Sequence, residues 1–259
     1  MIGAITRYWR IIGTGVSFLT FGVGGLVLGV AVFPVLGLVV QEQERRQRVA
    51  RAVIRSLFQI YIDLMRTLGV LRYDVVGLER LERQGLLIIA NHPTLIDTVF
   101  LMAFVKNADC VVNSALWSNP FTRGTVRTAG WVRDDSGPEM LEACIRSLTA
   151  GGNLVIFPQG TRTSQASEIH LKRGAANIAV RGARNVTPVF IRCSPPTLMK
   201  GSKWWQVPKR RAEFTIEVGQ DIEVGPFLAR AGGETIIARQ FNAHLEQYFS
   251  KEVGAHAVP

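Results

Sequence analysis

Charged residues, and acidic ones in particular, are scarce in this sequence. Asp, Glu, Lys and Arg together make up 19% of its 259 residues, whereas hydrophobic residues make up 47%. The 20 acidic residues are outnumbered by 30 Lys and Arg residues, which gives a formal net charge of +10 at pH 7. A composition this apolar is unusual for a soluble protein, so a membrane segment is the first feature to look for.

Cysteine and histidine are also few, and their spacing argues against several kinds of site. The three cysteines, Cys110, Cys144 and Cys193, lie far apart in the sequence. We expect reduced, buried thiols and no disulfide framework. The four histidines are scattered, so no cluster of metal ligands is predicted and no cofactor is expected.

No charged residue occurs between Ile11 and Val40. A helix that crosses a bilayer needs about 20 apolar residues, so this run is long enough to be an anchor. A cleaved signal peptide would be shorter and would end in a small-residue cleavage site. The glycines and Pro34 of the run leave two forms open, one tilted span or a bent or re-entrant helical pair. A buried core helix is a third, less favoured interpretation.

Basic residues are concentrated on both sides of this apolar run. Residues 1–56 contain seven Arg and two Glu, which gives a net charge of +5, half of the total. Such flanks suit anionic membrane lipids better than nucleic acid, for which no finger, basic helix array or aromatic RNA-binding motif is found. They also favour a cytoplasmic location for the rest of the chain, on the inner face of the cytoplasmic membrane.

Two further segments have a basic and apolar character. Residues 44–69 have apolar side chains at near-helical spacing with arginines between them, which predicts either an interfacial helix or a first helix covering a sheet. Residues 200–211 hold five basic residues, no acid and two tryptophans. This composition indicates either a contact with the membrane interface or a solvated loop.

The remaining sequence alternates between short apolar strands and helical segments, which is typical of an α/β fold. We expect a mixed, largely parallel sheet flanked by helices, with an N-terminal hydrophobic membrane segment. Residues 1–70 would form the membrane anchor and interfacial helix, and residues 71–259 the main domain. Strands are predicted at 71–76, 86–90, 109–112, 153–157, 186–193 and 212–218, and helices at 98–105, 141–148, 174–181 and 234–249.

A histidine and an acid stand at the first predicted strand-to-helix turn. The strand at 86–90 leads into Asn91-His92-Pro93, and Asp97 lies in the first turn of the next helix. One helical turn can bring the Asp97 carboxylate back to hold one ring nitrogen of His92, which leaves the other to take a proton. An isolated motif of this kind is usually a helix start with an acid that favours the dipole, so it needs support from elsewhere.

That support comes from a second strand end, Phe157-Pro158-Gln159-Gly160-Thr161-Arg162. Glycine lets backbone N–H groups approach an anion, and a guanidinium binds phosphate through paired hydrogen bonds. Two further blocks follow, Leu171-Lys172-Arg173-Gly174 and Val186-Thr187-Pro188-Val189. In this order the four blocks resemble the glycerolipid acyltransferases typified by bacterial 1-acyl-glycerol-3-phosphate acyltransferase, over roughly residues 75–220.

The resemblance implies transfer of an acyl chain from a thioester to the hydroxyl of a lysolipid. The donor would be acyl-carrier protein or acyl-CoA, and no nucleic acid would be bound. It implies that His92 is the general base and that Asp97 sets its tautomer. The acceptor phosphate would be held by Gly160, Thr161, Arg162 and Lys172, with Arg133 as a further contact. Asn91, Gln159, Gly174 and Pro188 are motif positions without an assigned role, and Pro188 is interpreted as structural.

The chain departs from the family pattern at two positions. Gln159 stands where the family usually has glutamate, and Ser136 stands where an arginine usually ends the second block, with Arg133 displaced from it. An amide oxygen still accepts hydrogen bonds, although it would hold a cation such as Arg162 less strongly than a carboxylate does. We therefore expect Gln159 to orient neighbouring groups and the enzyme to be active.

Three other functions are compatible with the same residues. The acceptor could be an amino-acid lipid, a glycolipid or a polyene lipid. An ester or thioester hydrolase is disfavoured because no Gly-x-Ser-x-Gly motif occurs. A non-catalytic lipid-binding membrane protein of the same fold would be consistent with the substitutions at Gln159 and Ser136. Turnover of an acyl thioester with a lysophospholipid acceptor discriminates between these functions.

Overall fold

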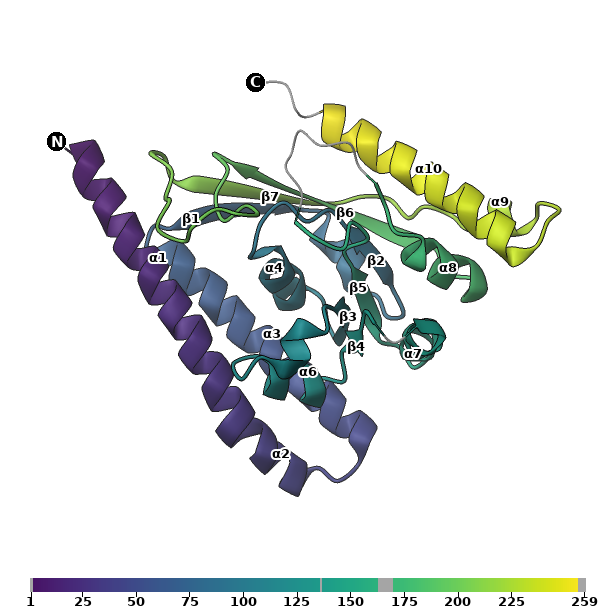
Figure 1. Ribbon diagram of the computed structural model, residues 1–259, viewed down its shortest axis with the longest axis horizontal. Helices are drawn as coiled ribbons and strands as arrows, with labels where there is room; N and C mark the ends of the chain where they lie inside the picture. The colour runs from purple at the N-terminus through teal and green to yellow at the C-terminus, as the bar shows by residue number, and fades with distance from the viewer. Residues whose placement is uncertain (1, 136, 163–169, 256–259) are drawn as a thin grey trace.

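The protein is built on one seven-stranded sheet with helices on both faces (Figure 1). The computed structural model describes residues 2–135, 137–162 and 170–255. The strand order is β1-β7-β6-β2-β5-β3-β4, and neighbouring strands are parallel except for β6 and β7. The predicted fold class is therefore confirmed. The strands are β1 (Leu71–Val76), β2 (Leu87–Ala90), β3 (Ala108–Val112), β4 (Val132–Arg133), β5 (Asn153–Ile156), β6 (Val186–Ser194) and β7 (Ala212–Val218).

The two central strands are buried on both faces, which explains their uninterrupted apolar sequences. Along β2, Ile88 faces one hydrophobic core and Leu87 and Ile89 face the other, because successive side chains of a strand point to opposite sides. The core containing Ile88 is covered by α3 (Gln43–Thr67), α4 (Asp97–Phe104), α5 (Ala115–Ser118) and α6 (Arg123–Thr128). The opposite core is covered by α7 (Gly137–Thr149), α8 (Gly174–Arg181), α9 (Gly225–Leu228) and α10 (Glu234–Ala255).

The predicted strands and helices are all present, with ends that differ by a few residues. The strand 71–76, the helix 174–181 and the strand 212–218 have the predicted bounds. The structure adds elements of two to six residues that the sequence analysis missed: β4, α5, α6, α9 and the 3₁₀ turn η2 (Leu78–Leu81). Elements this short carry too few residues to show a period.

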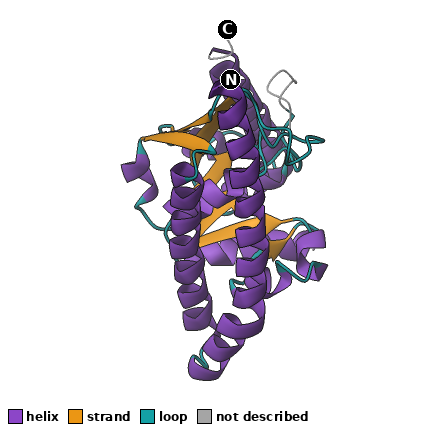
Figure 2. Ribbon diagram, turned by 90° about the vertical axis from the view of Figure 1, so that its left-hand side faces the viewer, coloured by secondary structure: helices purple, strands orange, loops and turns teal. Residues whose placement is uncertain are grey.

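The N-terminal apolar run forms one continuous helix, composed of α1 (Ile2–Val27), the π-helical segment η1 (Leu28–Val32) and α2 (Phe33–Val39). This N-terminal helix and α3 run side by side (Figure 2). Phe21 of α1 packs against Phe58 and Tyr61 of α3. No helical pair forms within the run itself. Pro34 is the second residue of α2, just after the π-helical segment, where the regular helical hydrogen-bond pattern is already interrupted.

One side of the apolar helix packs on the protein and the other is exposed. Gly124 of α6 lies so close to Gly29 that a Cβ at Gly124 would overlap it. Large apolar side chains on the outer side are open to solvent, among them Leu19 at 67% and Val30 at 70% exposure. The interpretation as a buried core helix is therefore wrong. Within the described residues, this is the one helix long and apolar enough to cross a membrane.

Helix α3 covers the sheet. This agrees with the second interpretation of residues 44–69, a first helix covering a sheet. Its inner face, which includes Ile54 and Met65, is buried in the core. Arg51 is buried as well: its guanidinium lies 2.9 Å from Asp109 on β3, and its Nε donates to the carbonyl of Ala129 at 2.8 Å. The arginines of this helix are thus not all solvated. The three cysteines are all buried, as predicted.

Candidate active site

The site lies at the edge of the sheet where β2, β5 and β6 end. Asn91 follows β2 directly, and its side chain pairs with the backbone of Ile191 on β6. Its Nδ2 donates to the Ile191 carbonyl at 2.8 Å, and its Oδ1 accepts from the Ile191 N–H at 2.6 Å. These two bonds extend the β2–β6 ladder by one residue. Asn91 thereby sets the point at which the chain leaves the sheet and His92 begins.

His92 and Asp97 are in contact, as the sequence predicted. The distance from His92 Nδ1 to Asp97 Oδ2 is 2.8 Å. Asp97 is the first residue of α4 and its side chain is fully buried, whereas the His92 side chain is 17% exposed. The contact uses Nδ1, so Nε2 is the ring nitrogen that can exchange a proton with a bound molecule. We refer to residues 92–97 as the His-Asp turn.

Thr94 completes the surroundings of the carboxylate and was missed by the sequence analysis. Its backbone N–H donates to Asp97 Oδ2 at 2.6 Å, and its hydroxyl donates to Oδ1 at 2.5 Å. Burial raises the pKa of Asp97 above its ordinary value, and the hydrogen bonds from His92 and Thr94 oppose that shift. The spacing of Thr94 and Asp97 is that of a capping box before an apolar helix, a signal that could have identified Thr94.

The end of β5 fixes His92 from two further directions. The ring of Phe157 stacks on the imidazole with a centroid distance of 4.4 Å and an interplanar angle of 29°. The side-chain oxygen of Gln159 accepts a hydrogen bond from the His92 backbone N–H at 3.0 Å. Gln159 therefore contacts His92 and not Arg162, the partner that the sequence suggested. The role of Phe157 was not predicted from the sequence.

Arg162 is joined to the His-Asp turn through one backbone oxygen. Its Nη1 donates to the carbonyls of Leu198 and Met199 at 3.2 and 3.3 Å. The same Leu198 oxygen accepts the N–H of Leu95, inside the His-Asp turn, at 3.1 Å. Both of these bonds come from Nη1, and the guanidinium has further donors, Nη2 and Nε, on its other sides.

Gly160 and Lys172 lie against each other, in agreement with their predicted grouping. Gly160 has a φ of +70°, and a Cβ at this position would lie 2.6 Å from the Nζ of Lys172. The Lys172 N–H donates to the Pro158 carbonyl at 2.7 Å, which holds the two segments together. Thr161 is exposed beside them, and Gly174 is the first residue of α8. The Lys172 ammonium thus lies against the glycine turn that leads along the chain to Arg162.

The other predicted positions lie apart from this group. Arg133 is at the end of β4, three strands from β2 and hence roughly 14 Å away at about 4.8 Å per strand. Its Nη2 lies 2.7 Å from Asp135, a carboxyl whose pKa this contact lowers. Ser136 lies outside the described residues.

The fourth motif block is in the interior of the sheet. Pro188 is buried on β6 in register with Ile89 of β2, consistent with a structural role. The neighbouring Thr187 donates its hydroxyl to Asp221 at 2.8 Å, and Asp221 is also paired with Arg83 at 2.6 Å. These contacts are at the amino-terminal end of β6, away from His92. No group of three or more potential metal ligands occurs in the parts of the chain that the structure describes.

The geometry at this end of the α/β sheet is suited to proton transfer. One imidazole nitrogen is held by a buried carboxylate and the other is able to act as a base. Comparison with known proteins indicates the class: residues 72–192, just under half of the chain, match the Acyltransferase family, and together with the similar proteins below this match supports an acyltransferase.

Similar proteins carry more specific names. The chain is 26% identical over 210 residues to a 1-acyl-sn-glycerol-3-phosphate acyltransferase of Pseudomonas aeruginosa, covering 78% of this chain and 76% of that protein. A Saccharomyces cerevisiae protein of the same name is 28% identical over 163 residues, 56% of this chain and half of the yeast protein. The crystal structure of the 1-acyl-sn-glycerophosphate (LPA) acyltransferase from Thermotoga maritima has the same fold, with a TM-score of 0.70, 17% identity and coverage of 99% and 100%.

Proposed function

We propose that this enzyme transfers a fatty acyl chain to the hydroxyl of a lysophospholipid such as 1-acyl-glycerol-3-phosphate. The donor is an acyl thioester of acyl-carrier protein or coenzyme A. The observation that carries the proposal is the 2.8 Å contact between His92 and the buried Asp97, in a turn that shares a backbone acceptor with Arg162. The names of the similar proteins support the choice of acceptor.

The proposed reaction begins with the acceptor hydroxyl at His92. Asp97 holds Nδ1–H, so Nε2 takes the hydroxyl proton while the oxygen attacks the thioester carbonyl. The tetrahedral intermediate then collapses, the carbon–sulfur bond breaks, and the imidazolium returns the proton to the leaving thiolate. An ester and a free thiol result. No enzyme serine is required, because the substrate itself supplies the nucleophilic oxygen.

We further propose that Arg162 and Lys172 bind the acceptor phosphate, with Gly160 and Thr161 shaping the turn between them. Guanidinium and ammonium groups are suited to a phosphate monoester, which accepts several charge-assisted hydrogen bonds. Arg133 is less well placed for this role, because it lies farther along the sheet and is paired with Asp135.

The exposed side of α1 and α2 is proposed to insert into the cytoplasmic membrane. The candidate span, Ile5–Val39, has 35 residues and would be about 52 Å long at 1.5 Å per residue, well beyond the ~30 Å of hydrocarbon. Its inner side packs on the protein as far as Phe33 and Leu36, so insertion along the membrane plane keeps the acyltransferase domain at the surface. Arginines near the helix ends favour the cytoplasmic face and anionic lipids.

Turnover by the purified protein in lipid vesicles tests the proposal. Acyl-carrier-protein and coenzyme A thioesters would be supplied with lysophosphatidate, and with amino-acid, glycolipid and polyene acceptors. We expect acylation of lysophosphatidate, with a loss of roughly 10² to 10⁴ in rate for His92→Ala, the usual cost of removing a positioned base. Equal rates for the native enzyme and His92→Ala would contradict the mechanism. A native protein inactive on every acceptor would favour the non-catalytic lipid-binding function.

A further inference from the structure

The segment between β6 and β7, residues 195–211, connects the active site to the N-terminal helix, and we call it the strap. It leaves β6 at the edge that carries His92. Its Leu198 carbonyl accepts hydrogen bonds from both Arg162 and Leu95. Leu198 has a φ of +53°, an unfavourable conformation for a residue with a large side chain. Such a conformation persists only where surrounding contacts hold it, and here it directs a carbonyl at two groups of the site.

Farther along, the strap is attached to α1. The ring of Trp204 lies 6.3 Å from that of Phe18, and a Cβ placed on Gly15 would be 3.2 Å from the Trp204 ring. Arg10, which is buried, donates through Nη2 to the carbonyls of Pro208 and Lys209 at 3.3 and 2.6 Å. The strap therefore contacts α1 at two places, roughly one and a half to two turns apart along the helix.

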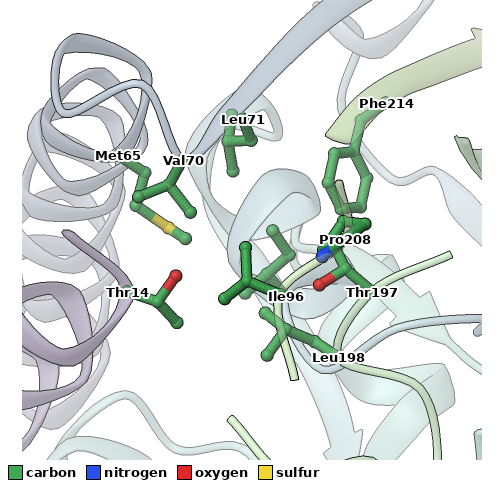
Figure 3. Close-up of a pocket in the computed structure, with 10 residues that line it drawn as sticks. Thr14, Met65, Val70, Leu71, Ile96, Thr197, Leu198, Pro208 and Phe214 are labelled. Atoms are coloured by element: carbon green, nitrogen blue, oxygen red, sulfur yellow. The ribbon is translucent and has the colours of Figure 1, made fainter. Parts of the chain in front are cut away.

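Figure 3 shows the residues that line the space between these contacts. A small cavity there is lined by residues of α1, α3, the strap and the His-Asp turn, including Thr14, Met65, Ile96 and Leu198. Its volume is about 10 Å³, room for roughly one water molecule and too little for an acyl chain. Ile96 directly precedes Asp97. Residues of α1, the strap and the His-Asp turn are therefore packed around one small cavity.

We propose that the strap positions Arg162 for the acceptor phosphate. Because the strap also packs on α1, acceptor binding depends on the position of the membrane helix. This inference rests on the proposed function, because it takes Arg162 to be a phosphate ligand. A free arginine side chain samples many rotamers. The two strap carbonyls restrict Arg162 to one orientation, and the shared Leu198 oxygen sets that orientation relative to His92. The lipid bilayer, which holds α1, would thereby prepare the site for a lipid acceptor.

Two glycines of α1 provide a matched test. Gly15 faces the Trp204 ring, whereas a Cβ on Gly24 meets nothing within 4 Å. Gly15→Leu and Gly24→Leu add the same apolar side chain to the same helix, one against the strap and the other on the open outer side. In vesicles of one composition, we expect Gly15→Leu to raise the KM for lysophosphatidate roughly 10-fold, the scale of one charge-assisted hydrogen bond, with little change in kcat. Gly15→Ala should have an intermediate effect and Gly24→Leu almost none.

Hydrogen exchange gives a second readout that needs no turnover. The Leu95 N–H bonds to the strap, so its exchange should accelerate in Gly15→Leu and not in Gly24→Leu. Unchanged Leu95 exchange and acceptor KM in Gly15→Leu would overturn the inference, as would equal changes in the two leucine variants. Failure of the native enzyme to acylate lysophosphatidate would instead overturn the proposed function, and Leu95 exchange would still report whether the strap and α1 are coupled.

Discussion

The side-chain oxygen of Gln159 accepts the backbone N–H of His92 at 3.0 Å. This contact accounts for an amide at a position where the family usually has a carboxylate. Either side chain offers an oxygen acceptor of similar reach. The function served at this position is to hold the start of the His-Asp turn, and that function requires no negative charge.

Two substitutions of Gln159 should therefore have different effects. Gln159→Glu keeps the acceptor, so we expect rates within about 10-fold of native, whereas Gln159→Leu leaves the His92 N–H without its partner. An unsatisfied donor costs about 1–3 kcal/mol, which corresponds to a loss of roughly 10- to 100-fold if the cost falls on the transition state. Steady-state kinetics with several lysolipid acceptors would measure both. A native enzyme that is inactive until Gln159→Glu is introduced would contradict this account.

Asp97→Asn should lower the rate of acyl transfer and should also change how the stability of the protein depends on pH. We expect a rate loss of roughly 10² to 10⁴, because an amide does not hold the required His92 tautomer in the same way. Burial raises the pKa of Asp97, so the folded state binds this proton more tightly than the unfolded chain does. The stabilising contribution of Asp97 is present at pH values below its unfolded pKa, near 4, and is lost as the pH rises through the folded value.

The stability of Asp97→Asn relative to native should accordingly improve between pH 4 and 8, because the amide does not titrate. Urea unfolding of both proteins in one detergent across this range would measure the trend. Thr94→Ser, which retains the hydroxyl donor to Asp97, is the matched control and should follow the native profile. If the native protein instead became more stable relative to Asp97→Asn as the pH rises, the linkage would have the opposite sign and this prediction would be wrong.

Arg162→Ala should weaken the use of phosphate-bearing acceptors more than it weakens thioester hydrolysis in their absence. Loss of a charge-assisted pair with phosphate should raise the acceptor KM by roughly 10-fold or more. Arg133→Ala, in which the lost guanidinium is paired with Asp135, serves as the comparison and should change the KM much less. Equal loss of acyl transfer and hydrolysis in Arg162→Ala would indicate a structural role for this arginine.

Arg51→Ala should destabilise the fold without acting on the chemistry directly. The substitution leaves the buried Asp109 without its ionic partner, and breaking such a pair typically costs about 3–5 kcal/mol. Removing both charges with Arg51→Met and Asp109→Asn should cost less than the single change, because no charge is then buried alone. Denaturant unfolding of the two variants would compare them, and a double variant less stable than Arg51→Ala would contradict this interpretation.

The outer face of the N-terminal helix, in α1 and η1, offers a direct test of membrane attachment. Leu19→Glu combined with Val30→Glu places charges on side chains that are 67% and 70% exposed, so the fold should tolerate them. We expect the double variant to move from the membrane to the soluble fraction, because charges in hydrocarbon are costly. Thr20→Glu, a single charge at an exposed polar position, should remain membrane-bound. Recovery of the native protein without detergent in the soluble fraction would contradict the anchor.

The sequence by itself determined the features that depend on neighbours along the chain. The strand periods, the apolar helix and the contact between His92 and Asp97 follow from local geometry, since five residues at a strand-to-helix turn have little freedom to lie elsewhere. The motif order was enough to indicate the family. The capping pattern of Thr94 and Asp97 was local too and could have been recognised.

The tertiary structure decided which distant groups meet. Gln159 and His92 are 67 residues apart, and they meet only because β5 pairs with β2. Arg162 and Leu198 are 36 residues apart, and their contact depends on β6 lying on the other side of β2. The order of strands is set by how both faces of the sheet are buried, a property of the whole chain that no single segment encodes. The same global packing buries Arg51 in the core and brings the strap into contact with α1.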